Sequence, residues 1–233
     1  MGEALAKMTS NQESLKSDKF YHIYNHGVGN DSLFFNNDNY IYFLKKFAEF
    51  VSPIANTYAY CLMTNHFHFL IQIKSEEEVF QFLKQSNKLP DEEITLTGFK
   101  TLSGGITDID FFSLHISKQF SNFFNGYSQA LNKQQKRKGA LLTRSFKRKE
   151  IKSSEYLISL IQYIHSNPVQ HGFVEKITDW KYSSYHSTIS DKPTQLKRKE
   201  VIELFGDIEN FKFCHQQKNQ ILLPELESEM ERL

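Results

Sequence analysis

Hydrophobic and polar residues alternate along some stretches of this chain and recur at helical spacing along others. Residues 20–25, 56–61 and 66–73 are rich in aromatic and β-branched side chains, which favours strands. The second and third of these stretches are close enough in sequence to pair as a hairpin. A fourth strand is predicted over residues 140–146, directly after Gly139.

Helical spacing of apolar residues predicts three helices, at residues 39–51, 112–135 and 197–205. Ser75 precedes three glutamates, and a serine cap with an acidic first turn is typical of a helix start. A further helix is expected to begin at Ser153 or Ser154 and to end at Asn167-Pro168, because the residue before a proline disfavours helix.

This mixture of strands and helices predicts an α+β fold. The order of elements fits a ferredoxin-like split βαβ antiparallel sheet with helices on one face and a helical C-terminal extension. The predicted parts are a flexible leader at 1–18, a main domain at 19–187 with an insertion around 88–110, and a helical extension with an acidic tail at 188–233.

Composition narrows the class of protein. Hydrophobic residues make up 39% of the chain and aromatic residues 14%, which indicates a globular protein. The only two cysteines are Cys61 and Cys214, too few for a disulfide framework, which fits a reducing compartment. No run of 18 apolar residues and no apolar leader is present. We therefore expect a soluble cytoplasmic protein that does not enter a membrane.

His66 and His68 are the first candidates for chemistry. Residues two apart in a strand project from the same face, so the two imidazoles point together while Phe67 and Phe69 point to the other face. Histidine is the commonest metal ligand, and two adjacent imidazoles form a chelating pair. The alternative is a structural role for both, since two ligands do not complete a metal site.

Tyr127 is the second candidate. It falls on the same helical stripe as Phe120, Phe124 and Leu131, which is typical of a residue that only fills the core. The functional hypothesis is that this helix packs on the sheet through its phenylalanines and brings Tyr127 over the histidine pair. A tyrosine hydroxyl has a pKa of about 10 and becomes a nucleophile only near a cation or a base.

Positive charge gathers between residues 133 and 152, where nine lysines and arginines stand against Glu150 alone. The whole chain has a formal net charge of only +1, so this run is strongly segregated. Clustered cations form an electrostatic footprint for phosphates, and we favour a nucleic-acid surface over a solvated turn. The residues predicted to contact DNA are Lys136, Arg137, Lys138, Arg144, Lys147 and Arg148.

Taken in order, these motifs resemble the HUH single-tyrosine transposases, in particular the REP-associated tyrosine transposase family. The matching segments are residues 21–27, 59–70, 139–147, 163–169 and 180–184, together with Tyr127. The most specific is Cys-Leu-Met-Thr-Asn-His-Phe-His at 61–68, and the resemblance covers about residues 20–187.

The resemblance implies a DNA transposase with a ferredoxin-like domain, in which a central strand carries the metal ligands His66 and His68. It also implies that Tyr127, on a following helix, attacks the phosphorus of single-stranded DNA and holds the 5′ end as a phosphotyrosine. A divalent ion, Mg²⁺ or Mn²⁺, would polarise the scissile phosphate. The implied substrate is single-stranded or hairpin DNA, which is cut and rejoined at hairpin-bearing ends, and family members act as monomers or as homodimers.

Three features depart from the family pattern. Insertion-sequence relatives often carry a glutamine four residues after the tyrosine as a third metal ligand, and Leu131 occupies that place. Gln129, Asn65, or waters with the DNA phosphate are the alternatives. His26 stands where the family usually has an arginine, and the 88–110 stretch has no counterpart.

Two other functions stay open at this point. One is a domesticated DNA-hairpin-binding protein without cleavage activity, which the missing ligand at Leu131 favours. The other is RNA binding or processing on the same fold.

Overall fold

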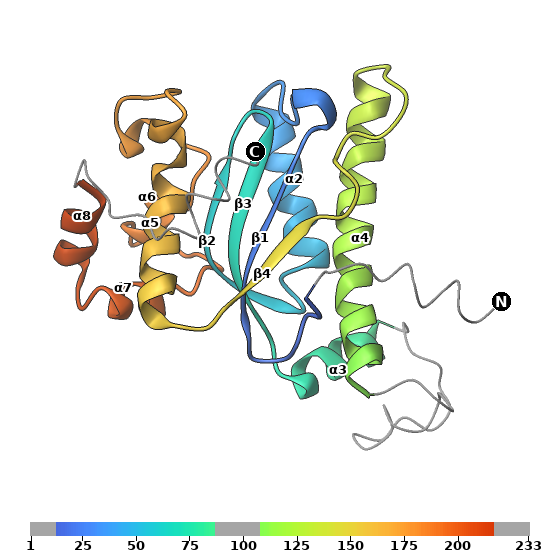
Figure 1. The fold of residues 1–233 in the computed structure, drawn as a ribbon, viewed down its shortest axis with the longest axis horizontal. Coiled ribbons are helices and arrows are strands. Elements are labelled where there is room, and N and C mark those ends of the chain that lie inside the picture. The colour runs from blue at the N-terminus through green and yellow to red at the C-terminus, as the bar shows by residue number, and fades with distance from the viewer. Residues whose placement is uncertain (1–12, 87–107, 217–233) are drawn as a thin grey trace.

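A four-stranded antiparallel sheet forms the centre of the molecule, with strand order β2-β3-β1-β4 (Figure 1). The computed structural model describes residues 13–86 and 108–216. The strands are β1 (Phe20–His26), β2 (Ala55–Leu62), β3 (His66–Ile73) and β4 (Lys147–Ile151). This order, with a helix between β1 and β2 and helices between β3 and β4, confirms the α+β class and the ferredoxin-like arrangement.

The helices of the described residues are α2 (Asn37–Phe50), α3 (Glu76–Gln85), α4 (Asp108–Gln134), α5 (Ser154–Gln170), α6 (Tyr185–Thr188), α7 (Arg198–Leu204) and α8 (Ile208–Gln216). Single 3₁₀ turns lie at η1 (Val28–Asn30) and η3 (Ile177–Asp179). Ser75 caps α3 in a full capping box with Glu78, and Ser153 caps α5. Helix α5 continues through Pro168 and ends at Gln170, two residues past the predicted end at Asn167-Pro168.

The fourth strand is not where the sequence pattern predicted it. Residues 140–146 form a loop beside the end of β1, where the Val28 N–H donates to the Leu141 carbonyl at 3.0 Å. The strand itself is the charged segment Lys147–Ile151, which pairs with β1 alone. Charged residues are usual on an edge strand because they discourage pairing with other chains. A strand of this composition lacks the apolar alternation on which strand prediction depends.

The sheet has two chemically different faces. Phe67, Phe69 and Ile71 of β3 project from the one called here the phenylalanine face, which α2 and α4 cover. His66, His68 and Leu70 project from the opposite one, the histidine face, which α5 and the helices after it cover (Figure 1). Helices were expected on one face only; α5 occupies the other because Leu160, Ile161 and Ile164 bury an apolar stripe against it.

The predicted leader, insertion and tail fall largely on residues 1–12, 87–107 and 217–233, outside the described part of the chain. Within residues 13–18 of the leader, Leu15 is fully buried, and its N–H donates to Ser113 Oγ of α4 at 3.1 Å. Within residues 13–86 and 108–216, no helix is both long and apolar enough to cross a membrane.

Candidate metal and tyrosine site

His66 and His68 lie side by side on the histidine face, with exposed fractions of 3% and 0%. Their Nδ1 atoms are each held by a neighbour: His66 Nδ1 lies 2.8 Å from Asn65 Oδ1, and His68 Nδ1 lies 2.9 Å from His22 Nε2. Their Nε2 atoms both face the side-chain amide of Asn167. His66 Nε2 lies 2.9 Å from Asn167 Oδ1, and His68 Nε2 lies 3.5 Å from Asn167 Nδ2. The two imidazoles therefore converge on one amide.

Both imidazoles are neutral near pH 7. Burial lowers the pKa of His66 to about 4, and burial together with His22 holds the pKa of His68 well below its ordinary value. A neutral imidazole carries one N–H and one lone pair. If the Nδ1–H of His66 donates to Asn65, its Nε2 presents a lone pair to the Asn167 Oδ1, so two acceptors face each other. Rotation of the amide, or a cation between the two atoms, would resolve that contact.

This donor set fits a divalent metal ion. Imidazole nitrogen suits transition metals, and amide oxygen suits harder ions such as Mn²⁺ and Mg²⁺. Metal-binding histidines commonly have their second nitrogen held by a hydrogen-bond partner, which is what Asn65 and His22 provide. The described residues contain no group of three His, Cys, Asp or Glu side chains placed to hold a metal, so a third protein ligand here would be Asn167.

A tyrosine lies against one member of this pair, His68, and it is Tyr163 of α5. Its ring is edge-on to His68 at 5.3 Å between centroids and edge-on to His22 at 6.3 Å. Asn167 follows it by four residues, so both side chains leave the same face of α5 toward the sheet. Tyr24 of β1 also stacks on His68, with its centroid at 5.8 Å. Tyr163 is fully buried, whereas Tyr24 is half-buried.

Tyr127 is on the wrong side of the sheet for the predicted role. It is buried on the phenylalanine face, where its hydroxyl donates to the Leu33 carbonyl at 2.5 Å and its ring packs edge-on against Phe43. Burial raises the pKa of its hydroxyl far above the ordinary value. The prediction that α4 brings Tyr127 over the histidines is therefore wrong, because α4 packs on the face opposite to them.

Because Tyr127 lies on the phenylalanine face, the residue four positions after it is not placed to share a metal ion with the histidine pair. Leu131 is buried on the phenylalanine face with Tyr127, and Gln129 lines a groove between α4 and the 139–146 loop. Neither residue lies on the face that holds the histidine pair. Asn65 contacts His66 through Nδ1, the nitrogen that points away from Asn167.

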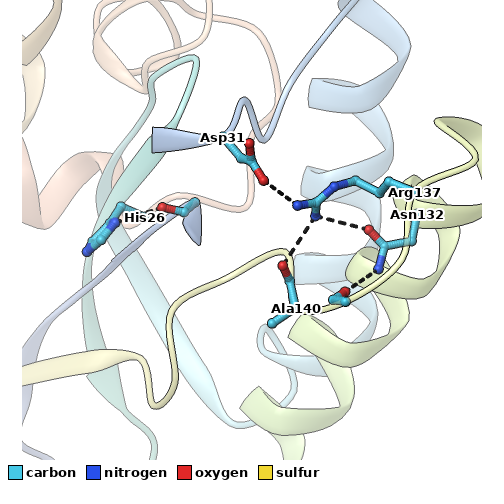
Figure 2. Close-up of polar contacts among 7 residues, drawn as sticks. His26, Asp31, Asn132, Arg137 and Ala140 are labelled. Atoms are coloured by element: carbon cyan, nitrogen blue, oxygen red, sulfur yellow. Dashed lines mark hydrogen bonds and ion pairs between the residues drawn. The ribbon is translucent and has the colours of Figure 1, made fainter. Parts of the chain in front are cut away.

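The cations of the basic run divide into two groups. Arg137 is held by protein groups: it forms an ion pair with Asp31 and donates to Asn132 Oδ1 and to the Ala140 carbonyl (Figure 2). Arg148 projects from the phenylalanine face and is half-buried, with Nη1 donating to Ser117 Oγ at 3.0 Å. Burial lowers its pKa. These two arginines brace the fold.

The second group is exposed and comprises Lys136, Lys138, Arg144 and Lys147. Lys147 pairs with Tyr24 across the sheet, and Tyr24 pairs with His68, so the three residues form one row on the histidine face. Adjacent strands lie about 4.8 Å apart, so this row spans about 10 Å. Lys147 thus places a positive charge on the same face as the histidine pair.

No family model matches the chain. A Haemophilus influenzae protein named "Putative REP-associated tyrosine transposase" is 26% identical over 154 residues, which cover 65% of this chain and 72% of that protein. This chain is thus similar in sequence to a protein named as a REP-associated tyrosine transposase.

A solved structure of a REP-associated tyrosine transposase bound to a REP hairpin covers 80% of this chain and 89% of its own. Its TM-score is 0.49 and its sequence identity is 14%.

One sequence signal in this chain points to Tyr163 and Asn167. A carboxamide four residues after a tyrosine is the spacing of the insertion-sequence relatives, and it occurs at Tyr163 and Asn167 rather than at Tyr127 and Leu131. The matching segment 163–169 contains both residues. Spacing along the helix was sufficient to find the pair, but only the packing of α5 shows that it faces the histidines.

Proposed function

We propose that this protein is a transposase that cleaves and rejoins single-stranded DNA at hairpin-bearing ends through a 5′-phosphotyrosine on Tyr163. The observation that carries the proposal is the convergence of Tyr163, Asn167 and the two histidines on one face of the sheet. The relationship to REP-associated tyrosine transposases supports the reaction class. The arrangement lies within one chain, so the proposal does not require a homodimer.

In the proposed site, His66, His68 and Asn167 hold a divalent ion, Mg²⁺ or Mn²⁺. When bound, such an ion would polarise the scissile phosphate and stabilise negative charge on the leaving oxygen. Asn65 and His22 orient the two imidazoles through their Nδ1 atoms. Lys147 and the exposed cations of the 136–144 segment attract the DNA backbone.

The chemical step transfers the phosphoryl group to the protein. The Tyr163 hydroxyl oxygen forms a bond to phosphorus and gives up its proton, while the bond from phosphorus to the 3′ oxygen breaks and that oxygen takes up a proton. The 5′ end stays attached to Tyr163 until a 3′ hydroxyl attacks the phosphotyrosine in reverse. Each step exchanges one phosphate ester for another, so rejoining needs no external energy source.

A second function has one observation in its favour. Tyr163, His68 and Asn167 are all fully buried, so a phosphate can reach them only after α5 or the loops around it move. A protein that binds hairpin DNA without cleaving it would have no need for that movement. The two functions differ in whether a covalent product forms.

The test is a covalent-capture assay with Mn²⁺ and single-stranded oligonucleotides that carry a hairpin and unpaired flanks. We expect an SDS-resistant adduct that is absent in EDTA and absent in Tyr163→Phe. Tyr127→Phe and Tyr24→Phe should both retain it. An adduct that persists in Tyr163→Phe would overturn the assignment of the nucleophile.

Two further measurements separate the alternatives. Hairpin binding without an adduct, unchanged in Tyr163→Phe, would support the binding function. A matched RNA oligonucleotide should displace the bound DNA only weakly. Displacement by RNA as effective as displacement by the matched DNA would favour an RNA function. Electron paramagnetic resonance of Mn²⁺ reports metal binding without any reaction, and we expect His66→Ala and His68→Ala to lose the bound signal.

A further inference from the structure

A cavity of about 400 Å³ adjoins the histidine pair at the end of the sheet where β1 ends and β3 begins. Its lining comes from three segments: the loop after β1, the turn between β2 and β3, and the chain that follows α5. The lining residues are Asn30, Ser32, Thr64, Asn65, His66, His171 and Phe173. Because His66 belongs to both, the cavity adjoins the candidate metal site.

The lining is polar but carries no formal charge from Asp, Glu, Lys or Arg among the described residues. It offers the carboxamides of Asn30 and Asn65, two hydroxyls and the His171 imidazole. Phe173 adds an aromatic ring that is 47% exposed. Side chains that bind phosphate are commonly cationic, whereas uncharged donors and acceptors beside an exposed ring match the edge and the face of a nucleobase.

The walls of the cavity are fixed by contacts outside it. The loop that carries Asn30 and Ser32 is tied to the end of α4 by the Asp31–Arg137 ion pair (Figure 2). On its other side, the Gly27 N–H donates to the Asn65 carbonyl at 2.8 Å. A Cβ at Gly27 would lie 2.1 Å from the Asp31 carbonyl oxygen, so this tight turn requires glycine.

The aromatic wall is supported as well. Phe173 lies edge-on to Trp180 at 5.7 Å between centroids, and the Trp180 indole N–H donates to the Leu62 carbonyl at 3.1 Å. The Phe173 N–H donates to the Pro168 carbonyl, one residue after Asn167. An exposed ring held in this way is preorganised, which reduces the loss of side-chain entropy when a ligand stacks on it.

We propose that this cavity binds one unpaired nucleobase next to the scissile phosphate and so selects which phosphodiester of the strand is cleaved. The base stacks on Phe173, and its edge faces Asn30 and Thr64. The inference rests on the proposed function, because it places the base beside the phosphate that His66 and Tyr163 would engage. It adds a base-selecting subsite to that reaction.

Selection from a library of single-stranded DNA with a random central stretch tests the subsite without any reaction. The selection is done in EDTA with wild-type protein, and the bound strands are sequenced. We expect a base preference at one unpaired position that Asn30→Ala and Thr64→Val change while preferences elsewhere stay. Bound strands without any such preference, or the same preference in both variants, would overturn the proposal.

A fluorescent base at the selected position gives the second readout. We expect 2-aminopurine to be quenched on binding, with binding about 5-fold to 150-fold weaker in Phe173→Ala and restored in Phe173→Trp. The matched control is Phe213→Ala, which removes a phenylalanine that is 60% exposed on α8 and should change nothing. Unchanged quenching and affinity in Phe173→Ala would overturn the subsite.

The two proposals fail in different ways. If quenching at one position depends on Phe173 but no covalent adduct forms with Mn²⁺, the proposed reaction fails and the base-binding subsite stands. If the adduct forms through Tyr163 but quenching is independent of Phe173, the reaction stands and the subsite fails.

Discussion

The two faces of the sheet each receive a tyrosine from a long helix, and the surroundings of the two tyrosines differ completely. Tyr127 of α4 lies among phenylalanines, and its hydroxyl is satisfied by one backbone carbonyl. Tyr163 of α5 lies against His68 and His22, one turn before Asn167, whose carboxamide contacts both His66 and His68. Helical position alone does not distinguish a core tyrosine from the one proposed to react; the neighbours on the opposing strand do.

The comparison also separates stability from chemistry. The phenylalanine face gains its stability from ring packing around Phe43, whose centroid lies within 5.1 Å of those of Phe34, Phe67, Phe123 and Tyr127. The histidine face places polar groups in the interior, each of which needs a partner. Substitutions on the first face should therefore change the free energy of unfolding, and those at the polar centre of the second should change the reaction.

The largest expected stability effect is at the centre of the phenylalanine face. Phe43→Ala should lower the free energy of unfolding by about 3–5 kcal/mol, because it removes a fully buried ring and leaves a cavity. Urea denaturation measures it, and Phe43→Leu provides a milder variant if the first does not fold. Ile41→Ala, at a residue of α2 that is 57% exposed, is the control and should change the value by less than about 0.5 kcal/mol. Equal losses at the two positions would contradict this account of the face.

The next effect should appear on acidification, through His215 of α8. Burial lowers its pKa in the folded protein to about 4, whereas an unfolded histidine titrates near about 6.5. The unfolded state therefore binds the proton first. The contribution of neutral His215 to the free energy of unfolding is complete above about pH 6.5. It declines by about 1.4 kcal/mol per pH unit as the pH falls toward 4.

Denaturation at a series of pH values compares His215→Phe with wild type. The variant should show a shallower pH dependence by about one proton, while Tyr127→Phe on the other face should keep the wild-type slope. His165 hydrogen-bonds to His215 at 2.9 Å and is also held neutral by burial, so part of the acid sensitivity remains in the variant. Identical slopes in His215→Phe and wild type would exclude this source of acid instability.

A smaller effect should come from Tyr127→Phe. Removal of the hydroxyl deletes its hydrogen bond to the Leu33 carbonyl and should lower the free energy of unfolding by about 1 kcal/mol. The covalent adduct with DNA should form at the wild-type level. Loss of the adduct in a folded Tyr127→Phe protein would contradict the assignment of Tyr127 to the core and of the nucleophile to Tyr163.

The smallest effect should be at the exposed cations. Lys147→Ala should reduce the slope of log binding constant against log salt concentration by about 0.7 for single-stranded DNA, because one phosphate contact is lost. Lys46→Ala is the control, since Lys46 lies on α2 and pairs with Glu49. A salt slope that Lys147→Ala leaves unchanged would show that Lys147 does not contact the DNA.

Arg137→Ala should instead lower the free energy of unfolding, since the Arg137 guanidinium binds Asp31.

Much of this fold could be predicted from local patterns. The alternation in β1, β2 and β3 and the periodicity of α2, α4 and α5 gave these elements within a few residues. The edge strand β4 was missed because Lys147–Ile151 is charged and has no apolar alternation. The shared face of His66 and His68 on β3 followed from their two-residue spacing, but the tyrosine beside them did not, since Tyr163 lies about a hundred residues further along the chain.

The sequence by itself determined that His66 and His68 share one face of a strand and that Phe67 and Phe69 share the other, because side-chain direction in a strand is a local property. Tertiary structure decided which helix covers each face, since that choice depends on contacts between residues far apart in sequence. It placed Tyr163 and Asn167 with the histidines, kept Tyr127 in the core, and bound Arg137 to Asp31. Periodicity identifies the buried side of a helix; only packing identifies what that side meets.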